Sequence, residues 1–94
     1  LAPSSAQAWL LSATLSRRLG KLAEAQAQIE RAFDLLPVDP EIGLEAGLIA
    51  MLSGREDAAR KSWESVVTVA PESAAAATAR GYIAQLDPPA GAGR

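Results

Sequence analysis

Apolar side chains recur along this chain every three or four residues, the spacing that places them on one face of an α-helix. The three clearest stripes are Leu22, Ala25, Ile29, Ala32, Phe33 and Leu36; Ala59, Trp63, Val66, Val67 and Ala70; and Ala75, Ala79, Tyr82, Ile83 and Leu86. Between the first two stripes, residues 40–52 are apolar on nearly every side, which is typical of a helix enclosed by its neighbours. The pattern therefore predicts an all-α protein.

Glycine and proline residues indicate where these helices end. We expect five helices, at about residues 5–19, 22–36, 40–52, 56–69 and 73–86. Gly20 and Gly54 follow the first and third helices and can adopt the left-handed conformation that closes a helix. Pro37 and Pro71 follow the second and fourth, because the residue before a proline is forced out of the helical region.

Polar residues indicate two of the helix starts. Ser4, with Gln7 three residues later, has the spacing of a capping box. Asp39 can cap the third helix, and Pro40 then occupies the first helical position, where its missing N–H costs nothing.

The same landmarks recur at a single spacing of 34 residues. The period relates Pro3 to Pro37 and Pro71, Gly20 to Gly54, and Ala25 to Ala59. Several independent positions share this period, so the chain contains an internal helix–turn–helix repeat.

A repeat of this length, with small residues between its helices and a closing proline, resembles the tetratricopeptide family. The matching residues are Trp9, Ala25, Ala32 and Pro37 in the first unit, Gly47, Ala59, Trp63 and Pro71 in the second, and Gly81 in the last helix. The departures are Ser12, Ala13 and Ser16 in the first unit and Gly43, Ala50 and Val66 in the second, so the repeats are degenerate. The abundance of alanine and arginine favours a GC-rich bacterial source.

The resemblance implies a right-handed α-solenoid over residues 1–87. Its parts would be one repeat at about 4–37, a second at about 38–71 and a C-terminal capping helix at about 72–87, with a flexible tail at 88–94. Residues 1–3 match the end of a unit, so a further repeat is expected upstream.

In the family, the first helix of each pair lines a concave groove that binds a partner. Carried over by position, the groove residues are Gln7, Leu10, Thr14, Arg17, Glu41, Leu44, Leu48, Met51, Thr78, Tyr82 and Gln85. Leu44, Leu48 and Met51 also fit a purely structural role in the core, because their helix is apolar all round. Trp9 and Trp63 are expected in the core.

Composition excludes several kinds of chemistry. The 94 residues include no cysteine and no histidine, so thiolate sites and the commonest general base are missing. The formal net charge of −2 argues against nucleic acid and against anionic membrane surfaces. Glu41 and Glu45 are one turn apart but have no third ligand in view. We therefore expect no enzyme activity, no cofactor and no metal site.

These observations favour a protein–protein interaction module that holds an apolar or helical partner segment. A clamp for a C-terminal carboxylate is excluded, because its positions in the family are occupied by Leu10, Thr14, Glu45, Ala75 and Ala79, none of them basic. The alternatives are a self-associating structural segment, which would form a homo-oligomer, and an accessory domain of a larger enzyme. Cytoplasm and periplasm are both compatible, since a targeting signal could precede Leu1.

Overall fold

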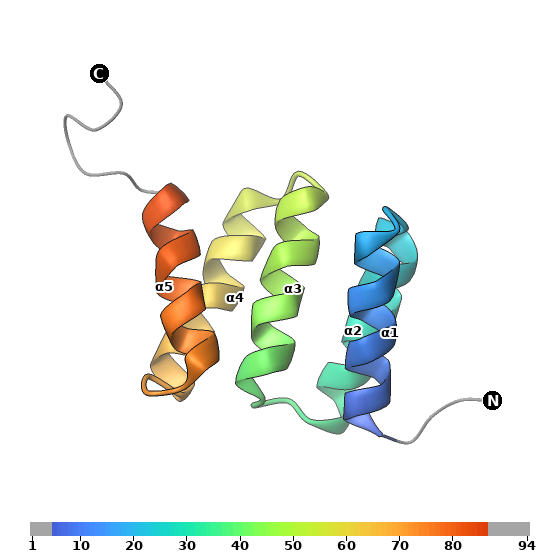
Figure 1. Cartoon of the computed structure of the whole chain (residues 1–94), viewed down its shortest axis with the longest axis horizontal. Helices are drawn as coiled ribbons and strands as arrows, with labels where there is room; N and C mark the ends of the chain where they lie inside the picture. Colours follow the sequence, from blue (N-terminus) through green and yellow to red (C-terminus); the bar gives the residue numbers. More distant parts are fainter. Residues whose placement is uncertain (1–4, 87–94) are drawn as a thin grey trace.

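The computed structural model describes residues 5–86, which form five α-helices (Figure 1). These are α1 (Ala6–Arg18), α2 (Leu22–Leu35), α3 (Pro40–Leu52), α4 (Glu56–Val69) and α5 (Ala74–Leu86). The expected all-α class is confirmed, and each helix lies within one residue of the bounds expected from the sequence. The expected tail at 88–94 and the match of residues 1–3 to the end of a unit lie outside the described residues.

Glycine closes α1 and α3 in the same way. Gly20 and Gly54 have φ angles of 79° and 80°, a region that only glycine enters freely. Beyond Gly20, the Lys21 N–H donates to the Ser16 carbonyl at 2.8 Å, which satisfies a carbonyl of the last helical turn. The equivalent bond recurs after Gly54, also at 2.8 Å, so the two turns have the same geometry.

Side-chain caps begin α1 and α3. The Asp39 carboxylate accepts the N–H groups of Glu41 and Ile42 at 2.9 and 3.1 Å, as expected for the cap of α3. At α1 the cap is Ser5 rather than the expected Ser4, and its Oγ accepts the Ala8 N–H at 3.4 Å. Ser4 itself lies outside the described residues.

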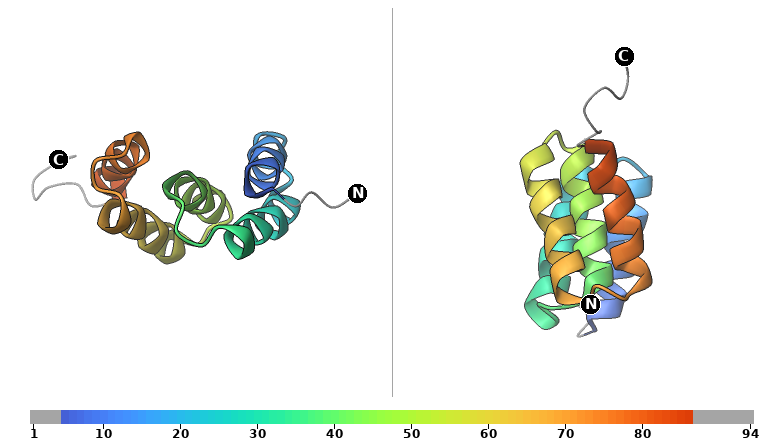
Figure 2. Two further views of the ribbon diagram at one scale, coloured as in Figure 1. Left: turned by 90° about the horizontal axis from the view of Figure 1, so that it is seen from below. Right: turned by 90° about the vertical axis from the view of Figure 1, so that its left-hand side faces the viewer.

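The helices pack as sequential antiparallel pairs that follow one another along an arc. α1 pairs with α2 and α3 pairs with α4, while α5 packs on α4 and α3. Viewed along the helices, α1, α3 and α5 form the inner side of the arc and α2 and α4 its outer side (Figure 2). This is the arrangement that the 34-residue repeat predicts.

Small residues allow these helices to approach closely. Ala13, Ala25, Ala59 and Ala79 are completely buried where neighbouring helices meet. At Gly47 the Trp63 ring lies directly against the α3 backbone, and a Cβ there would come within 2.5 Å of Trp63 Cδ1. The buried core falls into two clusters that meet at α3, one formed by α1, α2 and α3 and the other by α3, α4 and α5.

Alanine substitutions at two glycines test this close packing. We expect Gly47→Ala to lower the free energy of unfolding by about 1–3 kcal/mol, because its Cβ would displace the Trp63 indole. The matched control is Gly81→Ala, 34 residues later, where a Cβ would meet nothing within 4 Å. It should stabilise the helix by about 0.5–1 kcal/mol. Urea denaturation monitored by circular dichroism measures both, and equal effects would contradict the packing described.

Candidate functional site

The predicted groove residues all lie on α1, α3 and α5, the helices of the inner side of the arc (Figure 2). Leu10, Thr14, Arg17, Leu44, Leu48 and Tyr82 are half-buried, whereas Gln7, Glu41, Met51, Thr78 and Gln85 are exposed. Half-buried and exposed positions thus alternate along this face, and the exposed ones are polar except for Met51.

Several of these residues contribute to the core as well as to the surface. Leu44, Leu48 and Tyr82 pack against the second core cluster, and the Tyr82 ring lies 4.9 Å from that of Trp63. Met51 is 37% exposed and is not part of either cluster. Leu44 and Leu48 can therefore belong to the core and to the predicted groove at once, because each side chain is partly buried and partly open to solvent.

The two tryptophans occupy different environments. Trp63 is 2% exposed, as predicted for the core, and its indole N–H donates to the Leu44 carbonyl at 3.2 Å. Trp9 is only half-buried; it packs at the edge of the first cluster, with the Arg31 guanidinium 5.7 Å from its ring. A cation at this distance over an indole is attracted by the ring's negative face.

A buried carboxylate joins the two repeats on the inner face. Glu45 of α3 forms a salt bridge with Arg17 of α1, and the two side chains are 8% and 18% exposed. A second bond runs from Arg17 Nη2 to Glu45 Oε1 at 3.2 Å, and Thr14 Oγ1 donates to the same oxygen at 2.9 Å. This two-pronged contact satisfies the buried carboxylate and fixes the relation of α1 to α3.

The sequence interpretation missed this network. It listed Arg17 among the groove residues, and it considered Glu45 as an acidic residue in a clamp position and, with Glu41, as a metal ligand lacking a third partner. One signal could have revealed the pair. Arg17 and Glu45 carry opposite charges, and they lie on facing sides of the first helices of successive repeats.

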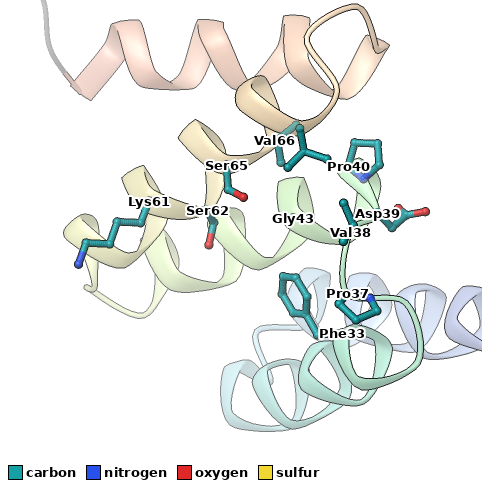
Figure 3. Close-up of a pocket in the computed structure, with 11 residues that line it drawn as sticks. Phe33, Pro37, Val38, Asp39, Pro40, Gly43, Lys61, Ser62, Ser65 and Val66 are labelled. Carbon is teal, nitrogen blue, oxygen red and sulfur yellow. The ribbon is translucent and has the colours of Figure 1, made fainter.

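A pocket lies between α2 and α4, the helices of the outer side of the arc (Figure 2 and Figure 3). It has a volume of about 360 Å³ and opens between the end of α2, the loop to α3, and α4. Phe33 and Pro37 lie on one side of it and Val66 on the other, and Val69 also lines it. Lys61 is the cation among its lining residues. Its walls are largely apolar, and the sequence pattern gave no indication of it.

A second hollow, of about 580 Å³, lies between α4 and α5 at the C-terminal end of the array. Its lining is Glu64, Val67, Thr68, Arg80, Ile83 and Ala84. Within residues 5–86, no three acidic, histidine or cysteine side chains come together as a metal site would require. No helix in the described part of the chain is long and apolar enough to cross a membrane.

The paired helices and their 34-residue period define a helical repeat array, an α-solenoid built from helical hairpins. More particularly, the helical hairpins are consistent with tetratricopeptide-like repeats. Over 66 residues, or 70% of the chain, the sequence is 36% identical to human tetratricopeptide repeat protein 7B. The chain spans about 8% of that protein's length. No family model and no solved structure matches the chain.

A double-mutant cycle tests the Arg17–Glu45 pair. We expect Arg17→Met and Glu45→Leu each to lower the free energy of unfolding by about 1–3 kcal/mol, because each leaves a largely buried charge unpaired. The double variant should recover much of that loss, since a buried ion pair can be replaced by apolar residues at little cost. Urea denaturation of all four proteins gives the coupling energy. Additive losses of unfolding free energy would show that the two side chains do not interact. Glu72→Gln, which changes an exposed loop residue, is the control.

Proposed function

We propose that the inner face of α1, α3 and α5 binds an apolar or helical segment of a partner protein. Tetratricopeptide-type arrays are generically protein-interaction modules, and the observation that supports this use here is the half-buried apolar strip of Leu10, Leu44 and Leu48. Apolar surface left partly open beside polar residues is typical of partner sites. The role is non-catalytic: a scaffold that holds another protein.

The charges of this face favour an apolar ligand over an acidic tail. Arg17, the basic member of the groove set, is already neutralised by Glu45. Leu10 and Met51 then offer flexible apolar contacts, and a methionine adapts well to varied partner surfaces. An amphipathic helix laid along the groove would bury its own apolar face against this strip.

Selection of helical peptides from a display library on the immobilised chain tests the groove. We expect enrichment of peptides with apolar residues at i, i+3 or i+4, and i+7. Met51→Glu should weaken their binding by about tenfold or more, since it places a charge three residues after Leu48, beside the apolar strip. Val38→Glu is the control, because Val38 is 65% exposed in the loop between α2 and α3, outside the groove.

Calorimetry of the selected peptides against these variants decides the outcome. Equal loss of affinity in Met51→Glu and Val38→Glu, or no loss in either, would refute binding in the groove. Retained helical content by circular dichroism shows that each variant is folded.

A second candidate function is self-association, and one observation favours it. Leu11, Leu15 and Leu19, which follow one another at four-residue intervals on and just beyond α1, are 70%, 59% and 63% exposed. Such a stripe of leucines resembles the contact face of a helix that packs against another.

Light scattering over a range of concentrations distinguishes this candidate from the groove. If the leucine stripe joins two copies, the average mass rises with concentration, and Leu15→Glu restores the monomer. If peptides bind in the groove, the Met51→Glu variant loses peptide binding but keeps the oligomeric state of the unaltered chain. A chain that remains monomeric at the highest concentration contradicts self-association.

A further inference from the structure

The pocket between α2 and α4 is formed by the two repeats themselves (Figure 3). All of its lining lies within residues 33–69, on the end of α2, the loop to α3, the start of α3, and α4. Its volume of about 360 Å³ is within the range of pockets that hold small molecules, roughly 300–1,000 Å³. Packing of the first repeat on the second thus leaves a space of ligand size between them.

Most of the pocket lining is apolar, and part of it is open to solvent. The apolar side chains are those of Phe33, Pro37, Val38, Pro40, Val66 and Val69. Val38 and Val69 are 65% and 48% exposed, so this apolar surface is in contact with water when the pocket is empty. A ligand with an apolar body would remove that surface from water, which favours binding in proportion to the area covered.

The polar groups able to hold a ligand are gathered on α4. Ser62 and Ser65 line the pocket, and their hydroxyls extend from α4 towards it (Figure 3). Lys61 precedes them on the same helix and is exposed. Within residues 5–86, none of these three side chains is engaged in a hydrogen bond or an ion pair. All three are therefore available to a ligand.

The charges around the pocket indicate which ligand suits these groups. Lys61 is the cation among the lining residues, and its flexible stem lets the ammonium turn over the opening. Asp39, the acidic lining residue, lies at the other end of the pocket, and its carboxylate accepts two N–H groups of α3. One positive charge beside two hydroxyl groups matches a single carboxylate. A doubly charged phosphate would leave one charge unpaired, on a chain whose own net charge is −2.

We propose that this pocket binds a small carboxylic acid with an apolar tail. The carboxylate lies at the Lys61 end and accepts hydrogen bonds from the ammonium and from the hydroxyls of Ser62 and Ser65. The tail packs between Phe33 and Val66. Because the ligand touches α2 and α4 together, it links the two repeats. No residue of the pocket lining belongs to the groove set, so the site is independent of the proposed groove.

Octanoate, titrated into the isotope-labelled full chain at neutral pH, serves as the probe. The expected result is saturable movement of the backbone amide signals of Val38, Ser62 and Ser65. Octanamide, which has the same tail and no charge, is the comparison ligand. It should bind the same residues about three- to tenfold more weakly, because it cannot pair with the Lys61 ammonium.

Chain variants separate the charge from the shape of the site. Lys61→Gln should lower the affinity for octanoate to that for octanamide and leave octanamide binding unchanged, whereas damage to the fold would weaken both. Lys21→Gln, at the chain's other lysine, is the control, because Lys21 does not line the pocket. Ser65→Leu, at an exposed helical position, should weaken both ligands by about tenfold or more, since it fills the pocket. Met51→Glu, in the groove, should change neither.

Three results would overturn the proposal. The first is no movement of the pocket amides at the highest soluble concentration of octanoate. The second is equal affinity of the unaltered chain for octanoate and octanamide, which would remove the role of the carboxylate. The third is movement centred on Leu10, Leu44 and Leu48, which would place the acid in the groove.

Discussion

The Trp63 indole lies in close contact with the backbone of α3 at Gly47, and the packing of α3, α4 and α5 depends on this contact. Because no Cβ intervenes, α4 approaches α3 closely enough for Trp63 to donate a hydrogen bond to the Leu44 carbonyl and to meet the ring of Tyr82 on α5. One side chain thus joins three helices. Completely buried alanines allow similarly close packing between α1 and α2.

A different kind of contact joins the first repeat to the second. The salt bridge from Arg17 to Glu45, with Thr14 as a third member, spans α1 and α3 on the inner face. Apolar packing is tolerant of small rotations, whereas a two-pronged ionic contact is directional, so this network sets how α1 is turned towards α3. It also removes a free cation from the groove. The same residues therefore hold α1 against α3 and leave Arg17 paired on the face that we propose binds a partner.

Local signals were enough to predict the five helices and their turns. Gly20 and Gly54 have the left-handed backbone that their position implied, and Asp39 caps α3 as expected. The resemblance to the tetratricopeptide family implied that α1, α3 and α5 share a common side. Contacts that depend on the orientation of one repeat relative to the next, such as that of Glu45 with Arg17, were not predicted from the sequence. The pocket beside Phe33 and Val66 was missed for the same reason.

The central claim is that close packing at Gly47 builds the array and its inner face. Measurement of nuclear Overhauser contacts of the Trp63 indole tests it most directly. The structure predicts strong cross-peaks from the indole ring to the Gly47 α-protons and to the Tyr82 ring. It also predicts slow exchange of the indole N–H with water, because this group is bonded to the Leu44 carbonyl. An indole N–H that exchanges freely and shows no contact with Gly47 would contradict the account.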